Sequence, residues 1–438
     1  MLSSAHPLRK KLWLGVGAIT LLVMTIVIGN FFVDREKAIT ADAVGHDFLA
    51  FYTAGHFLRE GKAEKMYDLE SVRKFQQEVG EANHLELKKQ SFGPFWNPPF
   101  YAWVFVPLAG FPFRWALAIW WGINLVCLAG ALVLMCRMLP SVDWRVLGLV
   151  PAIVLNSLPF HQALNHGQNT FGSLLILALV VTFWMRGAAF WAGISCGLLF
   201  YKPQLGAIVA IVLILHLGWR ALAGVGVCGL VLLGITVLSM PRIVSVYLAR
   251  MPGNLAWMQE TNSYLWERHV TFKAMWRLLF QGHAVGESFL IVKVLWILCA
   301  LGLGAALANA LYRCRRWGGK IASGRLISAT IICMPLLMPF YFDYDLLLIS
   351  IAAVLFAAEW VRMADRNVRP TAEDRWLMGA WVVLFVVMFF NSTLSGILRV
   401  HLAGIALTVV AGMQIRRAMR VNEVAVRVEA EERLAMAA

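Results

Sequence analysis

The chain has 438 residues, of which 60% are hydrophobic and only 15% are charged. This composition, with a mean hydropathy of +0.69, excludes an ordinary soluble domain and predicts an all-α polytopic membrane protein. The formal net charge is +14, but Lys and Arg cluster in short loops between apolar runs, so we predict no nucleic-acid partner.

The first apolar run, 12–33, follows a basic flank. It is longer than the hydrophobic region of a cleaved signal, about 7–15 residues, and predicts an uncleaved first helix with its N-terminus in the cytoplasm. The next segment, 34–112, is predicted to be an outer loop. Within it, 98–111 is short for a crossing and begins with two prolines, which favours a re-entrant or interfacial segment.

Further apolar segments predict about twelve spanning helices in all. Residues 188–218 are taken as two helices, although one broken helix is the alternative. After the first helix, the predicted spans are 113–136, 146–163, 169–185, 188–201, 204–218, 220–239, 286–311, 324–341, 343–361, 375–391 and 394–414.

Basic residues fix the predicted topology. The loops assigned to the cytoplasm are rich in Arg, whereas the short outer turns hold one basic residue, Lys202. The positive-inside rule therefore places 34–112 and a second large loop, 241–286, on the outer side. If 98–111 crossed and 188–218 were one helix, the turn "CRMLPSVDWR" would face outward against this rule. Residues 1–420 are predicted to form a single membrane domain, and 421–438 a cytoplasmic tail.

The stretch "GHDFLAFYTAGHFLREG" begins at Gly45. It predicts an amphipathic helix that lies flat on the membrane, with Phe48 and Tyr52 on its apolar side. Two interpretations of Asp47 remain open, because a carboxylate there can cap a helix that starts at Phe48 or act as a base.

Other polar side chains fall on the same predicted face. Lys202 lies between two apolar runs, where it must snorkel to the surface or meet an anion. Arg268 and His269 are either interfacial anchors beside Trp266 or substrate groups. The turn "NHGQN" carries His166, Gln168 and Asn169, a cluster typical of a water-filled cavity,.

Metal binding has little support in the sequence. The seven cysteines lie in or beside apolar runs without a C-x-x-C pair, so neither a zinc site nor a disulfide framework is predicted. Asp343 and Asp345 form a D-x-D pair, which either binds metal as in nucleotide-sugar enzymes or caps the next helix. We predict no cofactor and leave a divalent metal open.

A carboxylate, cations and amides on one face suit an amphiphilic substrate with an anionic head, such as a lipid phosphate. The sequence has no P-loop and no convincing G-x-G-x-x-G beside a strand, so an activated group would arrive on a lipid. A multi-spanning transporter is the main alternative, although no internal repeat is visible. A ligase or flippase of another fold and a scaffold without chemistry are further alternatives.

The sequence resembles the membrane glycosyltransferases of the C-type fold, and within them glycosyltransferase family 87. The matching pieces, in the family's order over about four-fifths of the chain, are "HDFLAFYTAGHFLREGKAEKMYD", "FWNPPFYAWVFVPLAGFPFRWA", "NHGQN", "AGISCGLLFYKPQLG" and "PFYFDYD". The resemblance implies a C-type fold with an outer juxtamembrane-helix loop after the first helix, in a bacterial inner membrane.

It also implies the chemistry. A hexose, with mannose the sugar expected, would pass from a polyprenyl-phosphate donor to a lipid or glycan acceptor on the extracytoplasmic face, with inversion. Asp47 would be the base, and Lys202 and Arg268 would hold the phosphate. The late turn reads "FDYDL" where mannosyltransferases carry histidines. The predicted substrate-binding residues are His46, Tyr52, His166, Gln168, Asn169, Lys202, Arg268, His269, Asp343 and Asp345.

Overall fold

The computed structural model describes residues 13–18, 20–21, 24–25, 45–85, 87, 92–141, 143–260, 264–317, 319–366 and 368–420. Most of the predicted first helix, 12–33, and the tail 421–438 lie outside these residues. The described residues form helices and no strands, apart from one isolated antiparallel bridge between His269 and Phe342. The predicted all-α class is confirmed.

The helices begin and end as follows. The first half comprises α2 (His46–Arg59), the 3₁₀ helix η2 (Ala63–Tyr67), α3 (Leu69–Ala82), η3 (Pro99–Phe105), η4 (Leu108–Gly110), α4 (Phe113–Met138), α5 (Trp144–Leu147), α6 (Leu149–Leu155), α7 (Leu158–His166), α8 (Thr170–Met185), α9 (Ala189–Leu198), η5 (Leu199–Tyr201) and α10 (Pro203–Leu217). The second half comprises α11 (Trp219–Ser239), α12 (Ile243–Glu260), η6 (Trp266–Arg268), α13 (Phe272–Gln281), α14 (Leu290–Trp317), α15 (Lys320–Leu337), η7 (Asp343–Ile349), α16 (Ser350–Asp365), α17 (Ala372–Leu398) and α18 (Leu402–Met419).

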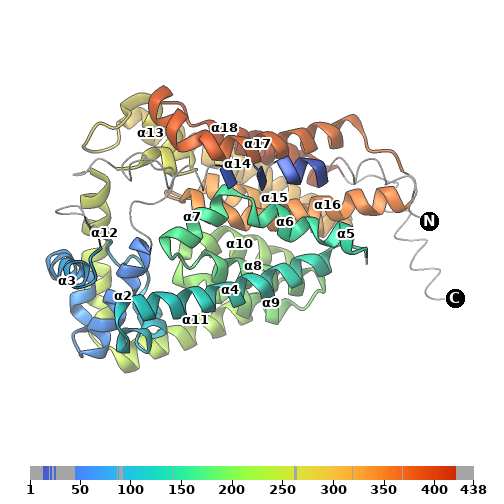
Figure 1. Cartoon of the computed structure of the whole chain (residues 1–438). Helices are drawn as coiled ribbons and strands as arrows, with labels where there is room; N and C mark the ends of the chain where they lie inside the picture. The colour runs from blue at the N-terminus through green and yellow to red at the C-terminus, as the bar shows by residue number, and fades with distance from the viewer. Residues whose placement is uncertain are drawn as a thin grey trace.

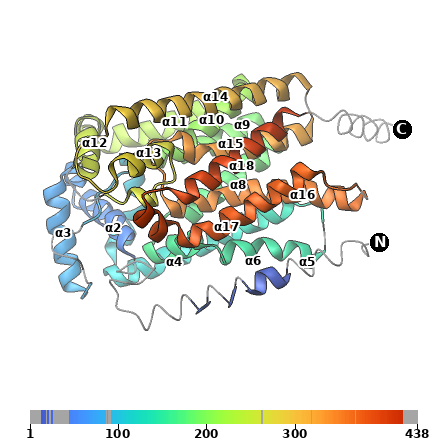
Figure 2. The same cartoon turned by 90° about the horizontal axis from the view of Figure 1, so that it is seen from above.

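The long apolar helices lie side by side, and α2, α3, α12 and α13 gather at one end of this bundle (Figures 1 and 2). Among the described residues, six helical segments are long and apolar enough to cross a membrane. A helix pair bent by 55°, 144–155 with 158–166, would make a seventh. Four apolar helices, α8, α9 with η5, α10 and α15, are shorter. Each of these segments overlaps a predicted span, although the break predicted between 391 and 394 lies inside α17. The number of about twelve crossings stays a prediction.

Two uncertain segments now have a defined form. Residues 98–111 form η3 and η4, with seven and three residues, rather than a spanning helix. Residues 188–218 form two helices, because α9 and α10 are separate and pack against each other. Pro203 starts α10 at a position that tolerates its missing N–H,.

The prediction that α2 has one apolar and one polar side is wrong, whereas its orientation flat on the membrane stays a prediction. Every residue from Phe48 to Gly55 is buried, so no polar side is exposed along the two turns that follow Asp47. The rings of Phe51 and Phe105 stack with centroids 4.9 Å apart, which packs α2 on η3. The helix is therefore a core element of the end of the bundle.

Small residues bring α9 and α11 into close contact. A Cβ on Gly224 would lie 2.1 Å from the Phe190 carbonyl oxygen, and one on Gly193 would lie 2.2 Å from that of Ala221. Neither backbone can yield to a methyl group without separating the helices. This is the packing that small residues permit between membrane helices.

We expect Gly224→Ala to lower the stability of the detergent-solubilised protein by about 1–3 kcal/mol, because the new methyl group overpacks the interface. Gly226→Ala is the matched control on the same helix, since its Cβ would meet nothing within 4 Å. Thermal unfolding of both variants tests this. Equal melting temperatures for the two would contradict the close packing.

Candidate functional site

The backbone at the start of α2 sets the position of Asp47. Gly45 adopts a left-handed conformation with φ of 78°, and its N–H donates to the Asn165 carbonyl oxygen at 2.7 Å. The helix begins at His46, and its N-cap residue is Gly45, without a side-chain cap. The interpretation of Asp47 as the N-cap is therefore wrong, because Asp47 lies inside the first turn.

A second glycine completes this junction. Gly167 ends α7 with φ of 67°, and a Cβ there would lie 2.9 Å from the Phe48 Cβ and 3.4 Å from the Gly45 Cα. Glycine at both positions lets the end of α7 touch the start of α2. This contact brings the "NHGQN" turn to Asp47.

Asp47 is surrounded by three side chains of the predicted set. Gln168 Nε2 donates to Asp47 Oδ2 at 2.7 Å, and His166 Nδ1 lies 3.3 Å from the same oxygen. His46 Nδ1 lies 3.7 Å from Oδ1. Burial alone would raise the pKa of Asp47, but His166 and, after it, His46 outweigh burial and hold that pKa well below its ordinary value,. Asp47 is therefore a stable carboxylate.

Gln168 connects this carboxylate to a buried ion pair. Its Nε2 also donates to the Tyr344 hydroxyl at 3.1 Å, and its Oε1 accepts from Lys202 Nζ at 3.5 Å. Lys202 Nζ donates to both oxygens of Asp345 at 3.1 Å and lies 5.3 Å from the centre of the Tyr344 ring. The Lys202 side chain is only 8% exposed, so the snorkelling interpretation is wrong and this lysine meets an anion inside the protein.

A second ion pair flanks His166. Arg268 binds Asp343 with two hydrogen bonds, from Nε at 3.0 Å and from Nη2 at 2.9 Å. Its Nη2 also lies 3.4 Å from His166 Nε2, and Gln162 Nε2 donates to Asp343 at 3.0 Å. Arg268 is therefore part of an internal network rather than an interfacial anchor.

The two aspartates of the D-x-D pair are the anionic partners of Lys202 and Arg268. Each aspartate binds one of these cations. Neither is the N-cap residue of η7, which is Phe342, although Asp343 Oδ1 also accepts from the Tyr344 N–H at 2.9 Å. In the part of the chain that the structure describes, no group of three or more His, Cys, Asp or Glu is placed to hold a metal ion. Metal dependence stays untested.

Three predicted residues lie apart from this network. The Tyr52 hydroxyl donates to the Phe111 carbonyl oxygen at 3.0 Å. Asn169 is buried at the start of α8. His269 is fully buried, its ring centroid 3.9 Å from that of Phe342; burial, and secondarily Arg268, lower its pKa well below the ordinary value, which keeps it neutral. An interfacial position is therefore wrong for His269.

The structure also brings in residues that the sequence did not single out. Thr170 donates to Asp345 at 2.8 Å, and Gln162 and Tyr344 make the contacts given above. Gln162 lies one helical turn before His166, on the same face of α7. Tyr344 stands between the two aspartates, so the D-x-D motif itself could have drawn attention to it.

The polar groups described above lie together at one end of an apolar bundle, as expected for a functional site in a membrane protein. A comparison of the sequence with protein families agrees with this interpretation. The model of glycosyltransferase family 87 matches residues 95–339, more than half of the chain. The chain belongs to glycosyltransferase family 87. The suspected resemblance is confirmed, and the protein is a membrane glycosyltransferase. No curated protein and no solved structure shows a significant match to this sequence.

The family match covers only part of the site. Residues 95–339 include His166, Gln168, Lys202 and Arg268, but Asp47 precedes the matched range and the D-x-D pair follows it. As a glycosyltransferase the protein needs a sugar donor and an acceptor. The roles of individual site residues rest on the geometry.

The buried ion pair gives a stability prediction. Asp345→Asn leaves Lys202 charged and buried without its anion, which we expect to cost about 3–5 kcal/mol. The double variant Asp345→Asn/Lys202→Met removes both charges and should recover most of that loss. Thermal unfolding of the single and double variants measures the coupling.

The control pair is Asp68 with Arg250, whose side chains are 38% and 46% exposed. Asp68→Asn keeps the N-cap of α3 and should cost about 0–1 kcal/mol. A double variant no more stable than Asp345→Asn would show that Lys202 does not need this anion.

Proposed function

We propose that the protein transfers a hexose, mannose in the first instance, from a polyprenyl-phosphate donor to a lipid or glycan acceptor on the extracytoplasmic face, with Asp47 as general base. The family supplies the reaction class. The donor, the acceptor, the face and the base go beyond it. The arrangement around Asp47 supports the assignment of the base.

The assignment of Asp47 as the base rests on one observation, the exposure of its carboxylate. Three carboxylates meet in the network, and two of them, Asp343 and Asp345, are bound to cations and only 12% and 4% exposed. Asp47 has neither Lys nor Arg as a salt-bridge partner among the described residues, and its side chain is 28% exposed. It is thus the carboxylate of this network that a hydroxyl group from outside can reach.

The proposed step is a single displacement. The acceptor hydroxyl donates its proton to Asp47, and its oxygen forms a bond with the anomeric carbon of the donor sugar. The bond between that carbon and the phosphate oxygen breaks, and its electron pair leaves with the polyprenyl phosphate. Asp47 Oδ2 already accepts from Gln168, so Oδ1 is the oxygen better placed to take the proton.

The leaving phosphate needs a cation, and Arg268 suits this role better than Lys202. Arg268 uses Nε and Nη2 for Asp343. Its Nη1 donors have no partner among the described residues and are therefore open to an incoming anion. The three protons of Lys202 are taken up by two contacts to Asp345 and one to Gln168. We therefore assign Lys202 the positioning of Gln168, and Arg268 the stabilisation of the developing phosphate charge.

The same geometry accounts for the altered late turn. Where the resemblance places acceptor-binding histidines, Asp343 and Asp345 bind the two cations of the network. The acceptor must then be held by other groups, and we assign this role to His46 and His166, whose Nδ1 atoms lie 3.7 and 3.3 Å from Asp47. No cofactor enters this scheme, because the donor supplies the leaving group.

Asp47→Asn should lower the rate of transfer by at least about a hundredfold, since a positioned base contributes about 10²–10⁴. The assay follows release of polyprenyl phosphate from a short-chain polyprenyl-phosphate mannose in detergent, with total membrane lipids as acceptor. Glucose and arabinose donors are run in parallel. Asp68→Asn, which removes a carboxylate outside the network, is the control and should retain activity.

Full activity of a folded Asp47→Asn protein would remove Asp47 as the base. A wild-type protein that releases no polyprenyl phosphate from any of the three donors, yet moves the lipid across vesicles, would favour the transporter or flippase alternative.

The low pKa of Asp47 predicts a pH dependence. Because the carboxylate remains ionised below its ordinary pKa of about 3.9, wild-type activity should not fall from protonation of Asp47 at mildly acid pH. His166→Gln removes the main charge that lowers this pKa, so burial then raises it. Asp47 would protonate at a higher pH, and the acidic limb of kcat/KM should move upward.

Initial rates over a pH series test this shift. His56→Gln, on the same helix but stacked on Phe75, is the control and should leave the limb in place. An unchanged limb in His166→Gln would show that His166 does not control the ionisation of Asp47.

A further inference from the structure

A cavity of about 190 Å³ opens at the other end of the helices from the Asp47 network, between α4, α8, α15 and α16. Helix α8 runs from the one site to the other, with Thr170 at its start and Met185 at its end. Its 16 residues separate the two sites by about 24 Å at 1.5 Å per residue. The cavity therefore belongs to a separate site.

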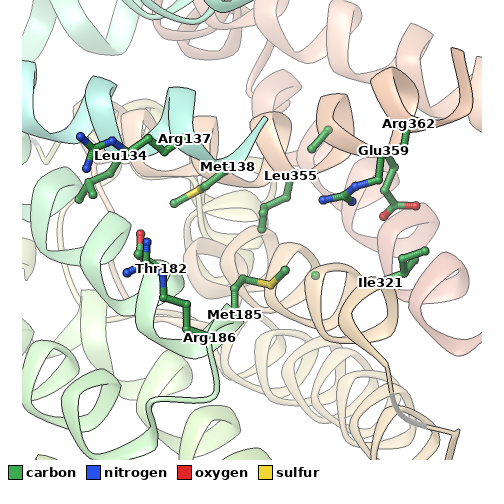
Figure 3. Close-up of a pocket in the computed structure, with 12 residues that line it drawn as sticks. Leu134, Arg137, Met138, Thr182, Met185, Arg186, Ile321, Leu355, Glu359 and Arg362 are labelled. Atoms are coloured by element: carbon green, nitrogen blue, oxygen red, sulfur yellow. The ribbon is translucent and has the colours of Figure 1, made fainter. Parts of the chain in front are cut away.

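Three arginines line this cavity: Arg137 in α4, Arg186 directly after α8, and Arg362 in α16. Figure 3 shows Arg137 and Arg186 at one side of the space and Arg362 with Glu359 at the other. Among the described residues, none of these three guanidinium groups has a recorded ion pair or hydrogen bond. Glu359 is already neutralised by Arg325 and Arg417, each at 3.0 Å. The cavity thus carries an uncompensated positive charge.

Between the charged sides lies an apolar wall. Met138, Met185 and Leu355 occupy the space between the arginines (Figure 3). The volume exceeds the roughly 150 Å³ cavity that holds a benzene molecule in another protein, so a small phosphorylated headgroup fits. A ligand that matches both features has an anionic head and an apolar body.

We propose that this cavity binds the phosphate headgroup of an anionic phospholipid. Its arginines lie near the ends of apolar helices, and a helix that crosses a membrane ends near the lipid headgroups. Basic pockets between membrane helices recognise such headgroups. The guanidinium groups bind the phosphate oxygens with charge-assisted hydrogen bonds, and the methionines contact the glycerol and upper acyl carbons. This site does not depend on the proposed transfer reaction.

The test uses the full-length protein, purified in detergent and stripped of lipid. Binding of phosphatidylglycerol is measured by native mass spectrometry and by the shift in melting temperature. Inorganic phosphate and phosphatidylcholine are titrated in parallel arms. The triple variant Arg137→Gln/Arg186→Gln/Arg362→Gln should bind phosphatidylglycerol at least about tenfold more weakly, because each arginine near a lipid surface contributes about 1 kcal/mol.

Two further variants separate the cavity from its charge. Arg220→Gln/Arg315→Gln/Arg369→Gln removes the same charge from arginines that do not line the cavity and should bind as wild type does. Gly324→Leu keeps every charge and adds an apolar side chain to the lining of the cavity; its Cβ would lie at an ordinary 3.7 Å from Met185, and binding should fall.

The outcomes are distinct. Weaker phosphatidylglycerol binding in the cavity triple variant and in Gly324→Leu, with an unaffected control triple variant, supports the site. Unchanged binding in the cavity triple variant, or equal loss in both triple variants, overturns it. An equal response to inorganic phosphate overturns the assignment to a lipid. Melting temperatures without lipid confirm that each variant is folded.

Discussion

A buried lysine is the constraint on which the polar end of this protein depends. Lys202 stands where α10 begins, and an ammonium group removed from water costs several kcal/mol unless an anion meets it. Asp345 supplies that anion from η7, more than a hundred residues away. Because Thr170 and Gln168 complete the coordination of this pair, the starts of α8, α10 and η7 are held together by one electrostatic requirement.

Asp47 is fixed to this scaffold from the other side. Gly45 and Gly167 let the start of α2 touch the end of α7, so Gln168 reaches Asp47 and Lys202 at once. The second pair, Arg268 with Asp343, holds His166 against the same carboxylate. Rigid support from buried pairs keeps the partly exposed Asp47 in a defined position, which is what a functional carboxylate requires.

Much of this arrangement was predictable from sequence. Hydropathy located the apolar helices, and the distribution of Arg and Lys placed Asp47, His166, Gln168, Lys202 and the D-x-D pair on one face. The pairings themselves were not predictable, because Lys202 and Asp345, or Arg268 and Asp343, meet only through tertiary packing. Without that information, Lys202 was equally compatible with snorkelling and the aspartates with capping.

The errors at α2 have a local cause. A side-chain cap at Asp47 and an amphipathic helix were each reasonable from composition. Gly45 instead takes the N-cap position, in a left-handed conformation and with its N–H donating to the Asn165 carbonyl oxygen. One side of α2 was expected to be polar and exposed to water. Instead, η3 and η4, which are made of apolar residues, cover the buried part of this helix.

The electrostatics of Asp47 also constrain how the proposed transfer proceeds. A general base is most effective when its pKa lies near the working pH, yet His166 and His46 hold the pKa of Asp47 far below that value against the effect of burial. Such a carboxylate has little affinity for the proton of an unreacted hydroxyl group. Its proton transfer must therefore follow the formation of the new bond to carbon, when the attacking oxygen has become acidic. On this proposal the rate depends on stabilising the departing phosphate, the role we assign to Arg268, which Asp343 holds with donors still available.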